Sequence, residues 1–331
     1  MIFLFFINTR GHPRVLSVMH ADGFMMLKRF PDTSPSPAPA PATYGAPAIG
    51  HVTRVSVPAP RHGRSWIRGM GICLAAMLLG GGISIAAEPP ANGPDGGYLT
   101  PDTQPDGTQY LPPPPRPGTA RQHTDDRAFT TTRALKGTPR WALATSDADL
   151  HEDALLHAFS CAAGQSLSTT ATPHLAALIH TMDVSEAPDM RKSKAYWHRP
   201  RPFVGNEQPI CTESDRTHLA TSGAYPSGHT MLGWSIALVL AELLPDRATP
   251  ILQRGRVFGE SRIVCGVHWE SDVQAGYMVG AAEIAAMHGS PAFRADMERA
   301  RSELAAHRHD AAGPQDPACA IESDAARHSP L

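Results

Sequence analysis

The chain has few aromatic residues, few charges and almost no net charge. Aromatic residues make up 6% and charged residues 18% of its 331 residues, and the formal net charge is −2. Without a basic excess there is no electrostatic reason to expect a nucleic-acid partner. The sequence also has no C-x-x-C pair and no histidine-rich cluster, so it gives no indication of a metal site or of another cofactor.

Alternating strand patterns and long apolar runs are missing as well. No apolar run reaches the roughly 20 residues of a membrane-spanning helix, and only Gly71–Ile85 comes near it. The second half of the chain has helical periodicity instead. Pro245, Gly289 and the Ser290-Pro291 pair mark where helices end and begin. We therefore predict an all-α helical bundle. Its helical segments are expected at Leu150–Ala163, Pro173–Met182, Met190–Trp197, Thr230–Leu244, Thr249–Cys265, Glu270–Met287 and Pro291–His307.

Proline divides the chain, because 19 of its 32 prolines precede position 121. Residues 1–60 are predicted to be a disordered N-terminal extension, since their Pro-, Ala- and Ser-rich part cannot bury enough apolar surface to fold. Residues 88–120 are predicted to form an extended Pro- and Gly-rich arm, and residues 309–331 a polar, frayed tail.

Residues 61–87 have the features of a signal peptide. Arg61, Arg64 and Arg68 form a basic region, an apolar stretch follows, and small residues precede Glu88. An uncleaved anchor is the alternative. The long extension before this segment suggests that translation begins nearer Val57. We expect a periplasmic or secreted protein with no membrane contact after cleavage.

The segment Ser261–Asp272, SRIVCGVHWESD, carries the clearest chemical signal. His268 and Asp272 are four residues apart and would share one face of a helical turn. The carboxylate can then fix the imidazole tautomer and leave the other ring nitrogen free as a nucleophile or ligand. Taken alone, such a pair is more often a surface His–Asp contact. Further cations and a second histidine upstream favour the catalytic interpretation.

Lys194, Arg201 and Arg262 would supply positive charge for the oxygens of a phosphate group, with arginine suited to bidentate binding. Pro226-Ser227-Gly228-His229 precedes an apolar helical run. Backbone N–H groups at such a helix start bind anions, Gly228 permits close approach, and Ser227 can also be an N-cap. His229 can protonate a leaving alkoxide and later deprotonate water.

These segments together resemble the three-part signature of the type 2 phosphatidic-acid phosphatase superfamily: K-x6-R-P, P-S-G-H and S-R-x5-H-x3-D. The flanking RPF, GAYPSGHT, GWSIALVLAEL and LPPPP sequences resemble bacterial class A non-specific acid phosphatases, over roughly Tyr98 to Leu304. Lys192 with Arg199 also fits K-x6-R-P. The match of Phe203 to the family's RPF implies Lys194 and Arg201 instead, with Arg199 behind the residues that contact phosphate. The resemblance implies a helical acid phosphatase domain at 121–308. It also implies His268 as nucleophile, oriented by Asp272, with His229 as general acid and base.

The cysteines fit an exported protein of this type. Cys73 leaves with the predicted signal, and the remaining even number can pair in three ways in an oxidising compartment. Cys211 and Cys265 belong to the family-like core and neighbour catalytic segments. We therefore favour pairing Cys211 with Cys265 and Cys161 with Cys319, with buried free thiols as the alternative.

The predicted activity is hydrolysis of phosphate monoesters, with phosphotransfer as a further activity and a homo-oligomer as the expected assembly. Two alternatives stay open at this point. A vanadium-dependent haloperoxidase would place vanadate in a similar cradle, although the flanking sequence argues against it. A membrane-associated lipid phosphatase would require several spans, which the sequence does not provide.

Overall fold

The computed structural model describes residues 16–19, 25–28, 96–310 and 316–331. The chain divides into two compact units, Met1–Gly80 and Gly81–Leu331. In the first unit, strands β1 (Leu16–Met19) and β2 (Met25–Lys28) pair antiparallel. We did not expect this hairpin; both strands precede the Pro-rich stretch on which the prediction of disorder rested. The predicted signal peptide at 61–87 lies outside the described residues.

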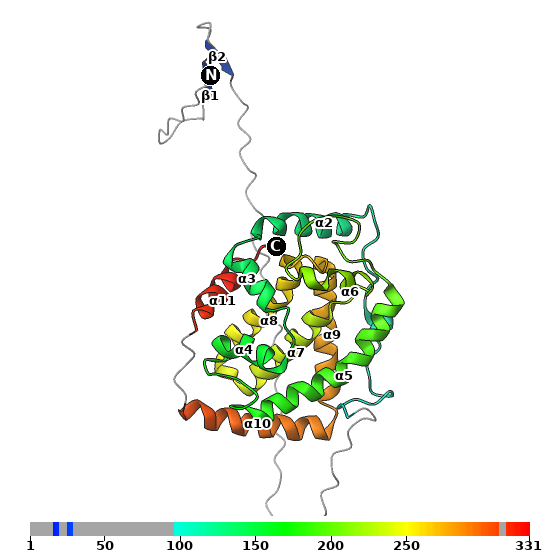
Figure 1. Ribbon diagram of the computed structural model, residues 1–331, viewed down its shortest axis with the longest axis vertical. Coiled ribbons are helices and arrows are strands. Elements are labelled where there is room, and N and C mark those ends of the chain that lie inside the picture. The colour runs from blue at the N-terminus through cyan, green and yellow to red at the C-terminus, as the bar shows by residue number, and fades with distance from the viewer. Residues whose placement is uncertain (1–15, 20–24, 29–95, 311–315) are drawn as a thin grey trace, which may run out of the picture. The chain divides into compact units, whose positions relative to one another are not determined.

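In the described part of the second unit, 96–310 and 316–331, every regular element is a helix. This confirms the predicted all-α fold class (Figure 1). In chain order the helices are α1 (Gly107–Tyr110), α2 (Ala120–Thr132), α3 (Pro139–Ser146), α4 (Glu152–Ala163), α5 (Pro173–Trp197), α6 (Arg216–Ala220), α7 (Gly228–Leu243), α8 (Ala248–Val264), α9 (Glu270–Met287), α10 (Pro291–Asp310) and α11 (Ala318–Arg327). Short 3-10 turns lie at Arg133–Leu135, Glu213–Asp215 and Pro245–Arg247.

Helix α7 is the centre of this unit and packs chiefly against α8 and α9 (Figure 1). Its sequence GHTMLGWSIALVLAEL is apolar on nearly every face, as expected for a helix enclosed by others. Ile236 and Leu240 are fully buried in the main core, together with Phe258 of α8 and Phe159 of α4. Burial of each such side chain stabilises the fold by about 1.5–3 kcal/mol.

Two glycines bring α9 against α7 at the end that carries the candidate site. A Cβ atom at Gly276 would lie 2.7 Å from the Ser227 carbonyl oxygen, and one at Gly280 would lie 2.7 Å from that of Met231. Only a residue without a Cβ permits this approach. The contact sets the PSGH segment beside the start of α9, where the backbone N–H of Ser227 donates to the Asp272 carbonyl at 3.0 Å.

Helix boundaries differ from the sequence prediction in several places. Helix α5 is continuous through Pro188, where two separate helical segments were expected. Helices α2 and α3 were not predicted; α2 reads ARQHTDDRAFTTT, which has too few apolar residues for a recognisable period. The predicted polar tail contains helix α11, which packs against α3 and α8.

The Pro-rich arm follows helix α5 rather than being wholly extended. The Tyr98 amide donates to Ser185 Oγ at 2.8 Å, and the Gly107 amide donates to Asp189 Oδ1 at 2.9 Å. Helix α1 forms a single turn within the arm, capped by Asp106. These contacts satisfy backbone groups of a segment that has no sheet partner.

Two disulfides join Cys161 to Cys319 and Cys211 to Cys265, with Cα–Cα distances of 5.4 Å and 4.6 Å. The predicted pairing is therefore confirmed. The first disulfide attaches α11 to α4. The second attaches the loop after Ile210 to the end of α8, where the Cys211 amide also donates to the Cys265 carbonyl at 2.9 Å.

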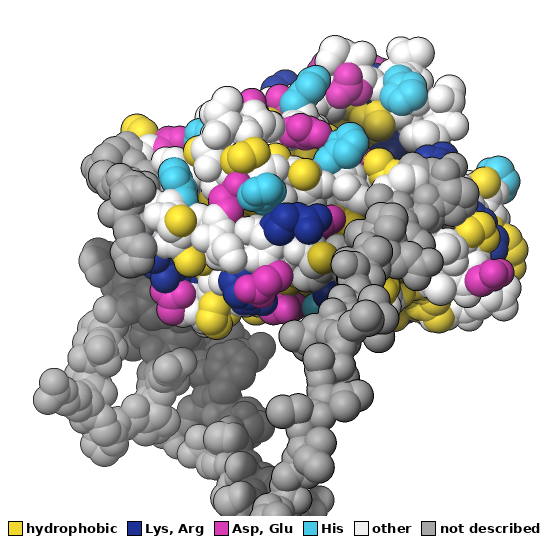
Figure 2. All heavy atoms as spheres, turned by 90° about the horizontal axis from the view of Figure 1, so that it is seen from below, with side chains coloured by type: hydrophobic (Ala, Val, Ile, Leu, Met, Phe, Trp, Pro, Cys, Tyr) yellow, Lys and Arg dark blue, Asp and Glu magenta, His cyan; other side chains and the backbone are white. Residues whose placement is uncertain are grey.

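On the face shown in Figure 2, basic, acidic and histidine side chains are interspersed, and hydrophobic side chains lie scattered among them. Scattered apolar side chains are normal on a protein surface. None of the helices in the described ranges combines the length and apolar character needed to cross a membrane.

Candidate active site

His268 and Asp272 are buried neighbours at the start of α9. His268 Nδ1 lies 3.4 Å from Asp272 Oδ2, and the Trp269 amide donates to the same oxygen at 2.8 Å. The sequence prediction placed both residues on one helical turn. His268 instead precedes the helix, because Trp269 is the N-cap and Asp272 occupies the first turn. The two side chains therefore meet across the N-terminal cap of α9, and not on one helical turn. Their contact is as predicted.

Arg199 holds the other oxygen of Asp272. Its Nη1 donates to Asp272 Oδ1 at 2.5 Å, and its Nη2 donates to Asp125 Oδ2 at 2.6 Å. Burial raises the pKa of Asp272 to about 7, and the bond to Arg199 acts in the opposite direction. Arg199 is thus occupied by carboxylates. Its partner in the rival register, Lys192, is exposed and bonds Asp106 at 2.8 Å.

Arg201 faces the second ring nitrogen of His268, with Nη1 3.0 Å from Nε2. The same Nη1 donates to the Val267 carbonyl at 2.9 Å, and Nη2 donates to Ser222 Oγ at 3.0 Å. Burial lowers the pKa of Arg201 to about 10. The side chain is therefore fixed against His268 by the loops on both sides of it.

Lys194, on the last turn of α5, belongs to the same cluster. Its Nζ donates to the Gly223 carbonyl at 2.8 Å. Burial and the neighbouring Arg201 lower its pKa to about 7, with Arg262 adding to the effect. Lys194 and Arg201 therefore lie together, as the K-x6-R-P register ending at Pro202 predicts.

Arg262 is 2% exposed and projects from the last turn of α8. Its Nε and Nη1 find no hydrogen-bond partner within the described part of the chain. Burial, followed by Arg201, lowers its pKa to about 9. Buried donors without a partner are costly, and donors in a cationic cluster suit an oxyanion. The residues present therefore fit a bound phosphoryl group.

The N-terminus of α7 lies beside the start of α9, where the Ser227 amide donates to the Asp272 carbonyl at 3.0 Å. Ser227 is its N-cap, and its Oγ accepts from the Thr230 amide at 3.4 Å and from Thr230 Oγ1 at 2.9 Å. The hydroxyl is thus used for capping, while the positive end of a 16-residue helix begins at Gly228. The N–H groups at such a helix start are suited to binding an anion.

His229 follows in the first turn of α7 and is half-buried. Its Nε2 lies 3.1 Å from the Ala148 carbonyl oxygen. Burial, then Arg262, holds its pKa well below the ordinary histidine value, and the Ala148 carbonyl opposes this. The pKa of His268 is also held well below its ordinary value, by burial and then by Arg201, Lys194, Arg262 and His229.

The structure therefore brings together all the predicted site residues, namely Lys194, Arg201, Ser227, Gly228, His229, Arg262, His268 and Asp272. Sequence reasoning missed the bond between Arg199 and Asp272 and the role of Asp125. The rival K-x6-R-P register pointed to Arg199, but nothing local to Asp125 distinguishes it from other helical carboxylates. Within the described residues, no group of three or more His, Cys, Asp or Glu side chains is arranged to hold a metal ion.

Comparison with known proteins agrees with this geometry. The PAP2 superfamily matches residues 170–295. An acid phosphatase of Zymomonas mobilis is 56% identical over 216 residues, which cover 65% of this chain and 82% of that protein. The chain belongs to the PAP2 superfamily.

Within the superfamily, the relatives are non-specific acid phosphatases. That of Providencia stuartii is 37% identical over 66% of this chain and 91% of its own length. That of Salmonella typhimurium is 38% identical over 59% of this chain and 78% of its own length. This PAP2 protein is accordingly an acid phosphatase, a hydrolase of phosphoric monoesters.

Proposed function

We propose that this acid phosphatase hydrolyses phosphate monoesters through a phosphohistidine on His268. The observation that carries the proposal is the position of the His268 ring. Its Nδ1 lies 3.4 Å from Asp272 Oδ2, and its Nε2 lies within the cation cluster, 3.0 Å from Arg201 Nη1. A nucleophile needs one nitrogen oriented by a base partner and the other directed at the electrophile.

In the first step Nε2 of His268 attacks phosphorus as the ester P–O bond breaks. His229 gives its proton to the departing alkoxide oxygen. In the second step His229 takes a proton from water, whose oxygen attacks phosphorus and breaks the P–N bond to release inorganic phosphate. An alcohol in place of this water would give phosphotransfer to a new ester.

The cations act on the charge that the phosphoryl oxygens carry in the transition state. Lys194, Arg201 and Arg262 are held at these positions before substrate arrives, so little reorganisation is needed during the reaction. Nε and Nη1 of Arg262, which have no hydrogen-bond partner among the described residues, supply positively charged donors for these oxygens. This reaction scheme requires no metal ion.

We also propose that the protein is exported, cleaved near Ala87, and active as a homo-oligomer in the periplasm or medium. The two disulfides support an oxidising compartment. Neither the haloperoxidase nor the lipid phosphatase alternative is favoured, because the similar relatives are acid phosphatases.

The decisive test compares His268→Ala and His229→Ala on two esters, with His174→Ala, an exposed histidine of α5, as the control. His268→Ala should abolish turnover of both esters. His229→Ala should largely spare the first step with p-nitrophenyl phosphate, whose leaving group needs no proton. It should reduce turnover of an alkyl phosphate by about 10²–10⁴-fold.

Because dephosphorylation still needs His229, His229→Ala should accumulate an acid-labile phosphoryl group on His268 when given p-nitrophenyl phosphate. Rapid acid-free quenching and peptide mapping would locate it. Label on His229 in the unmodified enzyme, or equal loss on both esters in both variants without a trapped intermediate, would refute this assignment.

A further inference from the structure

The Ala148 carbonyl is the hydrogen-bond partner of His229 within the described residues, at 3.1 Å from Nε2. A carbonyl oxygen can only accept, so Nε2 must carry a proton in both charge states of the ring. The proton that His229 exchanges with substrate or water is therefore the one on Nδ1. The same contact favours the charged imidazolium, since the carbonyl raises the pKa of His229 against the effect of burial.

Asp147, the residue before Ala148, is anchored in the interior at the C-terminal end of α3. It is 2% exposed, and its carboxylate accepts from Arg254 Nη2 at 2.5 Å, Arg254 Nη1 at 3.2 Å and Ser261 Oγ at 2.6 Å. A fork-shaped pair of this kind fixes both position and orientation. These bonds hold the end of α3 in place, and with it the Ala148 carbonyl that faces His229.

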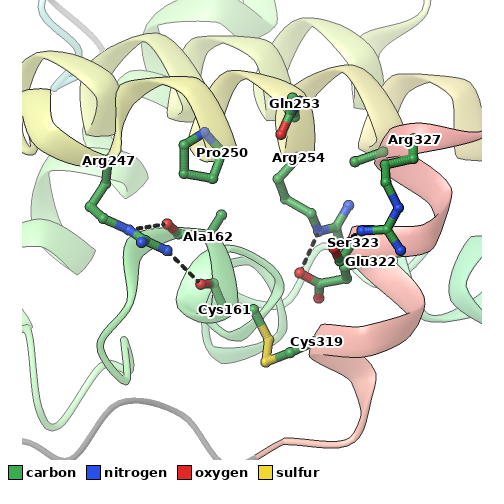
Figure 3. A pocket seen from close by; sticks show the side chains of 11 residues that line it. Cys161, Ala162, Arg247, Pro250, Gln253, Arg254, Cys319, Glu322, Ser323 and Arg327 are labelled. Carbon is green, nitrogen blue, oxygen red and sulfur yellow. Dashed lines mark hydrogen bonds and ion pairs between the residues drawn. A yellow bond between two sulfur atoms is a disulfide. The ribbon is translucent and has the colours of Figure 1, made fainter.

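Helix α11 completes the support of Arg254. Glu322 Oε2 lies 3.4 Å from Arg254 Nε, and both side chains are buried. Figure 3 shows this contact beside a cavity of ≈ 250 Å³, with the Cys161–Cys319 disulfide attaching α11 next to it. Helix α11 lies beyond residues 170–295, so this support comes from outside the part that matches the superfamily.

We propose that Asp147 is a positioning residue for His229, and that the C-terminal helix α11 maintains it through Glu322 and Arg254. The Ala148 carbonyl then sets the tautomer and protonation of the general acid. This inference rests on the proposed function, because it assumes that His229 gives a proton to the leaving group. Its distinguishing consequence is a defect that depends on the leaving group.

The test uses Asp147→Asn and Glu322→Gln in the full chain, with Asp324→Asn as the matched control, because Asp324 lies on α11 but is exposed. We expect kcat/KM for an alkyl phosphate to fall by about 10²-fold in Asp147→Asn and by about 3–10-fold in Glu322→Gln, within the range of general acid catalysis. For p-nitrophenyl phosphate, kcat/KM reports only the first step, whose leaving group needs no proton, so it should change by less than about 3-fold in both variants. The control should match the unmodified enzyme on both esters.

The pH profile provides a second readout. In Asp147→Asn the Ala148 carbonyl should move away from His229, which lowers the pKa of His229. The fall of kcat/KM for the alkyl phosphate with rising pH should therefore begin at lower pH. If that variant does not fold, Glu322→Gln and the Cys161→Ser/Cys319→Ser double variant must show the same preference between esters. Equal losses on both esters, or no loss, would overturn the inference. If His229→Ala itself fails to discriminate between the esters, the proposed function fails instead.

Discussion

Arg201 and His268 are in direct contact, with Nη1 of the arginine 3.0 Å from Nε2 of the imidazole. Arginine has only donors, so Nε2 must present its lone pair to Nη1 and the ring proton must lie on Nδ1, facing Asp272. The tautomer needed for nucleophilic attack by Nε2 is therefore imposed from both sides of the ring. In the proposed mechanism, the Arg201 guanidinium therefore both orients the nucleophile and binds the phosphoryl group.

Replacing Arg201 by lysine should show whether its hydrogen bonds matter in addition to its positive charge. Lysine keeps the positive charge but cannot bond Ser222, Val267 and His268 at once. We expect kcat/KM for p-nitrophenyl phosphate to fall by about 10²–10³-fold, the usual cost of one lost transition-state donor. Arg216→Lys, which changes a more exposed arginine paired with Glu213, is the control. A loss of less than about 3-fold in Arg201→Lys would contradict this role.

Lys194 should set the alkaline limb of activity. Its pKa is lowered to about 7 by burial and by Arg201. Lysine is charged below its pKa, so the cradle loses a cation as pH rises through about 7. For p-nitrophenyl phosphate, kcat/KM should decline there. Lys194→Arg should move that limb to higher pH, whereas Lys192→Arg should not. An unshifted limb in Lys194→Arg would assign it to another group.

Activity should be independent of metal ions. The cradle consists of cations and helix-start amides, which suit an oxyanion and repel Mg²⁺ or Zn²⁺. Hydrolysis of p-nitrophenyl phosphate should therefore survive dialysis against EDTA, and vanadate should inhibit by competing for the phosphate site. Loss of activity on chelation that is restored by one added metal would refute this expectation.

Two buried glutamates should each lower the stability of the folded protein as pH rises. Glu186 of α5 and Glu283 of α9 are fully buried, and burial raises their pKa values to about 8 and about 9. In the unfolded chain both carboxyl groups have the ordinary glutamate pKa of 4.5. Between these pKa values the folded state binds more protons than the unfolded chain. The stability that the two protonated carboxyl groups contribute is therefore fully present below about 4.5 and is lost as pH rises toward 8–9.

Thermal unfolding between pH 5 and pH 9 would measure this loss, expected at roughly 1 kcal/mol per pH unit for each group. Glu283→Gln should reduce the slope and raise Tm at alkaline pH, because a neutral amide replaces the buried acid. Glu298→Gln, at a side chain that is 71% exposed, should leave the slope unchanged. A slope that is the same in Glu283→Gln as in the unmodified protein would show that this carboxyl group does not titrate on unfolding.

Export should be visible in the protein itself. N-terminal sequencing of material from the periplasm or medium should begin near Ala87 or Glu88, with Cys161–Cys319 and Cys211–Cys265 oxidised. Thiol labelling under denaturing, non-reducing conditions should then find no reactive cysteine. Cytoplasmic protein that retains Met1 and reactive thiols would contradict the export proposal.

The local features of this protein were set by its sequence. Residue spacing identified the N-cap at Ser227 and the His268–Asp272 pair, because each depends on neighbours within about one helical turn. Apolar periodicity likewise located most helices of the bundle. It missed α2, whose few apolar residues give no period, and it divided α5 at a proline that tertiary packing tolerates.

Tertiary structure decided the contacts that join distant elements. The two possible K-x6-R-P registers were equivalent in spacing, and only folding assigned Arg199 to Asp272 and left Lys192 exposed. The Ala148 carbonyl reaches His229 across a sequence separation of 81, and Arg254 reaches Asp147 across 107. Periodicity reports only which face of one helix is apolar. Partners for buried charges depend on how separate helices pack, because only packing removes water and requires each charge to find a partner.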